Sequence, residues 1–405
     1  MVICLFTGFA SGLPLYLLLQ LLPAWLDSEG VNIKTIGAFT LTQLPYIWKF
    51  FWAPLMDGIS PLNMGRRRGW MFITQIALFL LIGSMGFFSP NLNIMLIAVM
   101  SFAIAFFSAS QDIVIDAFRR ELLNNNELGL GNSIHINSYR LAGLVPGSLS
   151  LILSHFLPWS SVFMITACFM LPAIIVTLWI KEPTNISPNR ENLKSIFGRA
   201  LMDFVERNGW KSVVLILAFI FLYKLGDSMA TSLATPFYLE MNFTKMDIGL
   251  VAKHASLWPS IIGALLGGIL MLKIGINKAL WLFGVIQAVS ILGFVWLSME
   301  GPFEQIHSVQ LMMLALVIAF EALGVGLGTA AFVAFIAKTT NPLYTATQFA
   351  LFTSFASIPR TLINSMTGFM VDAMGWTQFF WLCFFLAIPG MLLLSKVAPW
   401  RTNTE

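Results

Sequence analysis

Long uninterrupted apolar runs constrain this chain more than any other feature of its sequence. The hydrocarbon core of a bilayer is about 30 Å thick, so a spanning helix needs roughly 20 apolar residues. Glycine, proline, asparagine and charged residues divide the 405 residues into twelve such runs. Because the runs are continuous rather than alternating with period two, a β-barrel is excluded. The expected spans are 1–26, 33–57, 68–88, 92–119, 131–156, 160–180, 211–239, 247–272, 279–298, 309–337, 343–371 and 376–397.

The composition agrees with a membrane protein. Hydrophobic residues make up 58% of the chain and charged residues 10%, whereas soluble domains carry about 25% charged residues. A soluble enzyme, a disordered chain and a nucleic-acid binder are therefore excluded. Three scattered cysteines and four histidines without ligand spacing indicate neither a disulfide framework nor a metal site. We expect no metal, no cofactor and no enzymatic activity.

Positive charge predicts the orientation of the chain in the membrane, because lysine and arginine gather in cytoplasmic loops. The odd-numbered loops between the expected spans carry Lys34 and Lys245 alone. We therefore expect the even-numbered loops and both termini in the cytoplasm. These loops and the C-terminal tail carry Arg66, Arg67, Arg68, Arg119, Arg120, Lys181, Arg190, Lys194, Arg199, Arg207, Lys211, Lys273, Lys278, Lys338, Lys396 and Arg401.

The segment 182–210 has the character of a soluble linker. It begins with turn-forming prolines and asparagines. Apolar residues then recur at helical spacing from Leu193 to Val205, with charged residues between them. This pattern predicts an amphipathic helix on the inner face of the membrane. The simplest role is a tether between two halves of the protein, and a regulatory role is the alternative.

The two sides of that linker resemble each other. Pro23–Asp27 recurs as Pro236–Glu240, in each case followed by a lysine and then by Ile-Gly, and Arg140 has a counterpart in Arg360. Two six-helix halves in the same orientation form the parallel repeat of the major facilitator fold. We therefore expect an all-α polytopic membrane protein of that fold with twelve transmembrane helices. Its parts would be an N-terminal half (1–181), the linker (182–210) and a C-terminal half (211–405).

An acid and an arginine cluster flank the loop after the second expected span. Asp57 ends that span and Gly65-Arg-Arg-Arg68 opens the next, while a degraded copy, Gly275-Ile-Asn-Lys278, stands in the other half. The pattern resembles the gating motif of major facilitators, in which an acid–arginine pair and helix-end interactions hold the cytoplasmic side shut. Positive-inside anchoring would explain the arginines but not Asp57. The sequence departs from the motif at Gly58, where arginine is usual, and in its longer spacer.

Ionisable residues inside the expected spans are candidates for function, because each costs about 2.5–3.5 kcal/mol on insertion scales. On the fourth span, Ser108, Asp112 and Asp116 step by four and share a face, with Gln111 beside it. A carboxylate in a low-dielectric site takes up a proton more readily, so both acids are candidates for proton coupling. Asp116 also stands three residues before Arg119, and a static ion pair is an equally good interpretation.

The other intramembrane charges are in near balance. Lys224 and Asp227 are three residues apart and either pair with each other or serve the substrate and the proton. Four cations against four acids favour a zwitterionic or weakly anionic polar substrate. The remaining candidates are Lys253, Arg140 and Arg360 for substrate binding and Glu321 for proton coupling.

Motifs along nearly the whole chain resemble those of the AmpG-type muropeptide permease family. The resemblance implies proton-driven import of anhydro-muropeptides, the disaccharide–peptide products of peptidoglycan turnover, from periplasm to cytoplasm across a bacterial inner membrane. Gln348, within the last motif, joins the substrate-binding candidates. The motifs are Ala10–Pro14, Leu44–Tyr46, Trp52–Asp57, Gly65–Trp70, Ser108–Asp116, Leu222–Asp227 and Ala346–Leu351.

Other functions stay open from the sequence. A major facilitator carrier for another bulky polar solute, such as an acetyl-coenzyme A-like thioester, a peptide or a siderophore, would use the same fold. A transporter-like sensor would bind muropeptide and signal through 182–210 without net flux. The expected partners are the small-molecule substrate, protons and the lipid bilayer, with no nucleic acid, and the protein is expected to be a monomer.

Overall fold

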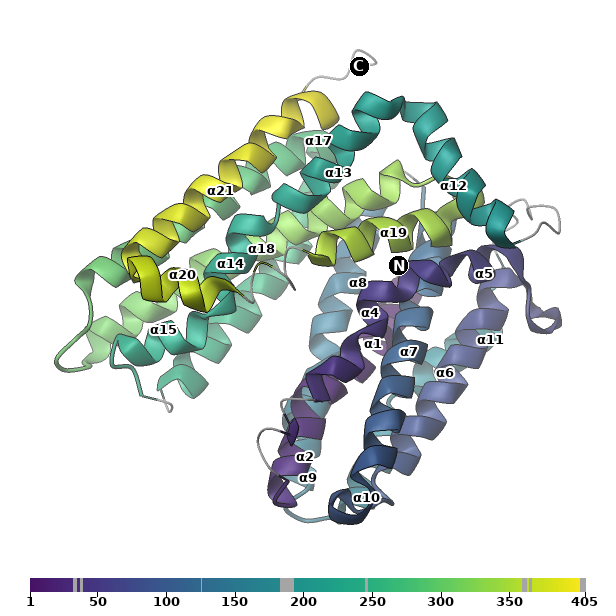
Figure 1. The fold of residues 1–405 in the computed structure, drawn as a ribbon, viewed down its shortest axis with the longest axis horizontal. Helices are drawn as coiled ribbons and strands as arrows, with labels where there is room; N and C mark the ends of the chain where they lie inside the picture. The colour runs from purple at the N-terminus through teal and green to yellow at the C-terminus, as the bar shows by residue number, and fades with distance from the viewer. Residues whose placement is uncertain are drawn as a thin grey trace. The chain divides into compact units, whose positions relative to one another are not determined.

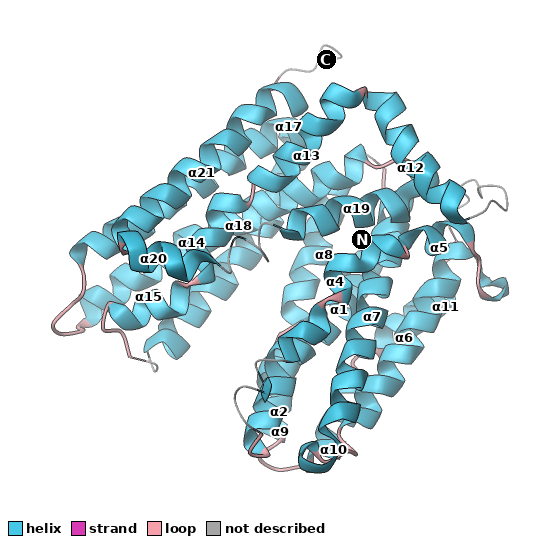
Figure 2. Ribbon diagram, in the orientation of Figure 1, coloured by secondary structure: helices cyan, strands magenta, loops and turns pink. Residues whose placement is uncertain are grey.

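A computed structural model describes residues 1–31, 35–36, 39–124, 126–182, 193–244, 247–358, 363 and 366–400. Every regular element in these ranges is helical, as Figure 2 shows, and they contain no strand. The all-α architecture expected from the apolar runs is confirmed.

The chain divides into two compact units, which we describe separately. Helix α19 packs with the first unit, although it lies by sequence in the second half of the repeat. The halves and linker expected from the sequence stay a prediction, because units defined by packing need not follow a repeat. The first unit comprises Met1–Asn124, Ile134–Asp203 and Thr339–Ser354, and the second Asn125–Ser133, Phe204–Lys338 and Phe355–Glu405.

The first unit is a bundle in which α6 packs against α7, α10 and α11, and α1 packs against α7 and α11 (Figure 1). Trp25 and Phe163 are fully buried in its core, with their rings 4.9 Å apart and edge to face. Helices that lie wholly or partly in this unit are α1 (Val2–Tyr16), α2 (Leu22–Ser28), α4 (Pro45–Trp48), α5 (Ala53–Gly58), α6 (Arg66–Met85), α7 (Pro90–Leu122), α8 (Leu128–Ala142), α9 (Ser150–Leu153), α10 (Trp159–Cys168), α11 (Leu171–Trp179), α12 (Leu193–Asn208) and α19 (Thr345–Ile358).

The second unit is organised around α21, which packs against α13, α14 and α17 (Figure 1). Aromatic rings fill its core: the ring centroids of Phe237 and Phe380 lie 4.8 Å apart and those of Phe294 and Phe380 5.3 Å apart. Its helices are α13 (Trp210–Leu222), α14 (Leu225–Ser232), α15 (Ala234–Glu240), α17 (Lys253–Glu300), α18 (Ser308–Thr339), α20 (Thr367–Met374) and α21 (Trp376–Val397).

Eight helical segments of the described residues are long and apolar enough to cross a membrane. One of them, Leu250–Glu300, carries two expected spans, because Gly275 interrupts its helix. The expected spans 33–57, 131–156 and 343–371 form as shorter helical pieces instead. Proline begins several of these pieces, at Pro45, Pro54 and Pro146, because it lacks an amide donor and suits a first turn. The chain is a multi-pass membrane protein.

The two turns that the sequence pairs as copies have similar backbones. Gly65 precedes α6 with φ 99° and ψ 166°, and Gly275 precedes the second stretch of α17 with φ 77° and ψ 165°. A positive φ favours glycine, which has no Cβ. The degraded copy of the motif therefore keeps its turn, although the side chains around the two turns differ.

Candidate functional site

Arg67 is the centre of a buried ion cluster in the first unit. It lies in the first turn of α6, two residues after Gly65, and is 0% exposed. Its guanidinium donates to Asp57 Oδ1 at 2.8 Å, to Glu121 Oε1 at 2.6 Å and to the carbonyl of Met56 at 3.0 Å. Charge-assisted bonds to two carboxylates compensate the guanidinium for the water it loses. The cluster therefore ties together α5, α6 and the end of α7.

Arg66 and Arg68 attach the beginning of α6 to further elements. Arg66 donates to the carbonyl of Asp57 at 3.1 Å and to Glu121 Oε1 at 3.3 Å. Arg68 donates to the carbonyl of Leu178 on α11 at 2.7 Å. The three arginines thus make different contacts, and Arg67 is the most deeply buried of them.

Glu182 caps the N-terminus of α6. Its Oε1 accepts from the Arg67 amide at 2.7 Å and its Oε2 from the Arg68 amide at 3.0 Å. The first amides of a helix have no partner within the helix, and a carboxylate there also meets the positive end of the helix dipole. A Cβ on Gly65 would lie 2.6 Å from Glu182 Cδ. The turn therefore favours glycine for its positive φ, and a Cβ there would push the Glu182 side chain out of its capping position.

Asp57 joins this cluster to the beginning of α19. Its Oδ2 accepts from the amide of Thr347 at 2.8 Å and from the hydroxyl of the same residue at 2.6 Å, and its Oδ1 accepts from the amide of Ala346 at 3.3 Å. Both residues lie in the first turn of α19. One buried carboxylate thus bridges the Arg67 guanidinium and a helix N-terminus.

Gln348, a predicted substrate-binding residue, is engaged by the linker helix α12. Its Nε2 donates to the carbonyl of Ala200 at 2.8 Å and to Asp203 Oδ2 at 3.0 Å, while its Oε1 accepts from the amide of Asn341 at 2.7 Å. The Asn341 side chain also donates to Asp203 Oδ1 at 2.8 Å. Gln348 is 2% exposed, so its amide serves to fasten α12 to α19.

The polar face predicted on the fourth span lies on α7 and meets α1. Asp112 Oδ1 accepts a hydrogen bond from the Ser11 hydroxyl, and Gln111 Nε2 donates to the carbonyl of Ala10 at 2.9 Å. Ser108, one turn before Asp112, is fully buried. Within the described residues, Gln111 Oε1 is buried without a hydrogen-bond partner. The predicted polar face of α7 therefore exists, and it contacts α1.

Two of the predicted acids are held in local ion pairs. Asp116 Oδ1 lies 2.7 Å from Arg119 Nη2, and Asp227 Oδ2 lies 3.0 Å from Lys224 Nζ. Asp116 and Arg119 lie three residues apart on α7, where side chains meet naturally. Lys224 instead directly precedes α14 and pairs with Asp227 in the first turn of that helix. Asp112 differs from them, because no lysine or arginine of the described residues lies within 4.0 Å of its carboxylate.

The remaining predicted residues are distributed over several helices. Arg140 is half-buried in the last turn of α8, and Lys253 is exposed at the start of α17. Glu321 is buried on α18. Arg360 lies outside the described residues. In the part of the chain that is described, no cluster of histidine, cysteine, aspartate and glutamate is placed to hold a metal ion.

Several contact residues were missed by the sequence reasoning. Glu121 follows directly after two arginines, where an acid within a basic loop is a signal of pairing. Glu182 begins the linker and Asp203 lies within it, and neither belongs to a motif that indicates its partner. Thr347 and Ser11 lie inside the quoted motifs, but a hydroxyl in an apolar run does not reveal its partner.

Comparison with known proteins identifies the family of the chain. The family model of the Major Facilitator Superfamily matches residues 4–303. An uncharacterized protein of Haemophilus influenzae is 51% identical over 407 residues, which cover 100% of this chain and 96% of that protein. The anhydromuropeptide permease of Escherichia coli K12 is 40% identical over 395 residues, which cover 97% of this chain and 78% of that protein.

Solved structures show the same fold at low sequence identity. The major facilitator transporter FucP in its outward conformation has a TM-score of 0.71 at 15% identity and covers 98% of both chains. The proton:xylose symporter XylE has a TM-score of 0.68 at 12% identity, with 98% of this chain and 95% of that chain covered. At these identities the similarity establishes the fold alone.

Proposed function

Because this chain belongs to the Major Facilitator Superfamily, we propose that it is a secondary transporter that imports anhydromuropeptides from periplasm to cytoplasm across a bacterial inner membrane. One observation carries the proposal: the 40% identity to the Escherichia coli anhydromuropeptide permease along 97% of the chain. Similarity of fold would not support a substrate class, because one fold serves many functions. The protein would act as a monomer, with both termini in the cytoplasm, and release its substrate chemically unchanged.

The buried arginine cluster would be the gate of this transporter. The proposal rests on Asp57, which contacts both Arg67 and the first turn of α19. Gating requires contacts that are strong when made and that can be exchanged for others. Hydrogen bonds between one carboxylate, a guanidinium and a helix N-terminus satisfy the first condition. Gly65, Arg66 and Arg68 would keep α6 in the position that these contacts need.

Asp112 is the acid that we assign to proton coupling. A coupling carboxylate must be able to bind and release a proton, and a tightly held cation opposes protonation. Asp116 and Asp227 are within ion-pair distance of Arg119 and Lys224. Asp112 instead accepts from the Ser11 hydroxyl on α1, which is a weaker constraint. Glu321 is the second candidate.

The substrate-binding assignments follow from charge and polarity. A muropeptide carries sugar hydroxyls, an amine and carboxylates. Ser108 and Gln111 would contact hydroxyl or amide groups from α7. The cations proposed for substrate carboxylates are Lys224, Lys253, Arg140 and Arg360. Gln348 would act indirectly, because its amide is occupied by Ala200, Asp203 and Asn341.

Uptake into proteoliposomes tests the function and the coupling residue together. The purified protein should accumulate labelled GlcNAc–anhydroMurNAc, with and without its peptide, when the outside is more acidic than the lumen. Asp112→Asn should abolish accumulation but keep exchange of labelled for unlabelled substrate, because exchange needs no net proton movement. Ser101→Ala, on the same helix, is the matched control, since its hydroxyl bonds to its own helix at Ile97.

Each result has a definite meaning. Accumulation by Asp112→Asn equal to that of the unchanged protein would refute Asp112 as the coupling group and leave the transport proposal intact. Saturable binding without flux by the unchanged protein would identify a sensor instead. Recovery of hydrolysed substrate would show an enzyme.

A further inference from the structure

A buried lysine of the first unit, Lys49, has no part in the contacts described so far. It begins the turn Lys49–Phe51, which directly follows α4, and it lies within the expected span 33–57. Only 7% of its surface is exposed. A charged side chain inside a membrane span is costly, and such residues are kept where they serve a function. The surroundings of Lys49 indicate what that function is.

The segment that carries Lys49 packs against the polar face of α7. Both α4 and the turn after it contact α7 (Figure 1). Trp52, three residues after Lys49, donates from its indole nitrogen to the Ser110 hydroxyl at 2.9 Å. Tyr46, three residues before Lys49, interacts through its phenol with the Asp112 carboxylate. The segment is therefore fixed to α7 on both sides of the lysine.

Lys49 and Asp112 attract each other without forming a contact pair. Of the two cations that act on the Asp112 carboxylate, Lys49 acts more strongly than Arg119, and Arg119 is itself held by Asp116 at 2.7 Å. No carboxylate of the described residues lies within 4.0 Å of the Lys49 ammonium. The charged and polar side chains that act on Asp112 come from α1, α4, the turn after α4 and α7: Ser11, Tyr46, Lys49, Asp116 and Arg119.

The Lys49 ammonium is available to a ligand. It makes no hydrogen bond in the part of the chain that the structure describes, and its Nζ atom is not sealed from solvent. Lysine carries its charge at the end of a flexible stem, so the ammonium can move between nearby anions. An anion that reaches this place through solvent would meet a cation that no contact pair occupies.

We propose that Lys49 links the proton to the substrate by exchanging partners. It neutralises the Asp112 carboxylate when that acid is charged, and it binds a carboxylate of the substrate when a proton occupies Asp112. The proton enters from the periplasm onto a carboxylate oxygen of Asp112 and leaves to the cytoplasm, and no other covalent bond forms or breaks. The inference rests on the proposed function and names one substrate-binding residue for it.

Binding of labelled GlcNAc–anhydroMurNAc-peptide to the purified full chain, measured at a series of pH values from acid to alkaline, tests the exchange. The unchanged protein should lose affinity as the pH rises, because a charged Asp112 competes for Lys49. Asp112→Asn should bind tightly at every pH, since a neutral amide does not compete. Lys49→Gln should weaken binding at acid pH roughly ten- to hundredfold, the range for a hydrogen bond to a charged group, and should remove the pH dependence.

Two further variants separate the charge from the fold. Lys49→Arg keeps the cation and should retain both the affinity and its pH dependence, which shows that a loss in Lys49→Gln is not caused by misfolding. Lys211→Gln is the matched control, because it removes an exposed lysine at the start of α13. This variant should bind as the unchanged protein does.

The outcomes distinguish the inference from the function on which it rests. If Lys49→Gln bound as tightly as the unchanged protein, or lost affinity with rising pH in the same way, the exchange would be refuted and the transport proposal would stand. Equal weakening by Lys49→Gln and Lys49→Arg would show a structural role and overturn the exchange. An unchanged protein that binds no muropeptide at any pH would refute the proposed function, and the inference with it.

Discussion

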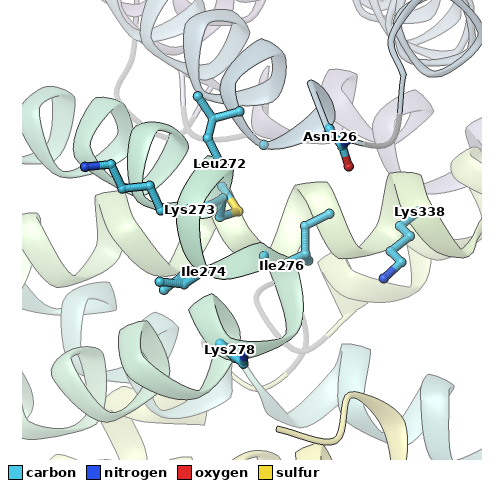
Figure 3. A pocket seen from close by; sticks show the side chains of 10 residues that line it. Asn126, Leu272, Lys273, Ile274, Ile276, Lys278 and Lys338 are labelled. Carbon is cyan, nitrogen blue, oxygen red and sulfur yellow. The ribbon is translucent and has the colours of Figure 1, made fainter. Parts of the chain in front are cut away.

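The turns at Gly65 and Gly275 have nearly the same backbone, yet their surroundings are chemically opposite. At the first, arginines are buried against Asp57, Glu121 and Glu182. At the second, Lys273, Lys278 and Lys338 line a cavity whose lining contains no acidic residue (Figure 3). The two turns thus share a backbone conformation, while the side chains around them differ.

The difference follows from the chemistry of the two cations. Arginine presents a planar fork that can bind two carboxylates and tolerates burial, whereas the lysine ammonium is compact and strongly hydrated. A buried ion cluster such as that of Arg67 therefore needs arginine, with acids that the fold places around it. A lysine suits a position that stays near water, such as the exposed Lys273 and Lys338. Three pairs of substitutions test this comparison, from the largest expected effect to the smallest.

Arg67→Ala should cause the largest loss of stability. It leaves the Asp57 and Glu121 carboxylates buried without their main cation, and breaking a buried pair in this way costs about 3–5 kcal/mol. The midpoint of thermal unfolding in detergent, followed by tryptophan fluorescence, measures the loss. Lys273→Ala, just before the other turn, should stay within about 0.5 kcal/mol, because its side chain is exposed. If the two substitutions lowered the midpoint equally, the contrast between the turns would be wrong.

Substituting the two glycines separates the cost of backbone strain from the cost of a crowded Cβ. Both combine a positive φ with a ψ near 165°, a region that essentially only glycine adopts, so alanine at either position costs about 1–3 kcal/mol in backbone strain. Gly65→Ala also forces a Cβ to within 2.6 Å of Glu182 Cδ, whereas a Cβ on Gly275 would have no other group within 4 Å. Gly65→Ala should therefore unfold at a lower temperature than Gly275→Ala. The reverse order would contradict the role of Glu182 as a cap.

Thr347→Val should have the smallest effect of the three. It removes one hydroxyl bond to the Asp57 carboxylate and keeps the backbone amide bond, so the loss is about 1.5 kcal/mol, the low end for a hydrogen bond to a charged group. Thr353→Val is the control on the same helix, because its hydroxyl bonds back to its own helix at Phe349. The same unfolding measurement applies. A larger loss at Thr353 than at Thr347 would argue against α19 as a partner of the cluster.

The sequence predicted which segments are helical better than where those helices are interrupted. Long apolar runs identify helices because length and hydropathy suffice for a membrane span. The expected spans 33–57, 131–156 and 343–371 are interrupted, and hydropathy does not detect such interruptions. Their helical pieces begin at prolines such as Pro45 and Pro146, which a count of apolar residues treats as ordinary members of a run.

The candidate site was predictable where partners are near in sequence and less so where they are distant. The pairs of Asp116 with Arg119 and of Lys224 with Asp227 join residues only three positions apart. Glu182 lies 115 positions from Arg67, and no pattern in one sequence connects them. Gln348 was assigned to substrate from its motif, whereas its amide is occupied by neighbours that only the fold brings together.

The burial of Arg67 also has a consequence for how the chain enters the membrane. Asp57 precedes Arg67 by 10 positions, whereas Glu121, the second carboxylate on its guanidinium, follows by 54. The ribosome therefore makes the arginine and its first acid well before the second acid. During that interval water takes the place of Glu121 on the guanidinium. The ion cluster is complete, and Arg67 fully buried, only after the end of α7 has been made.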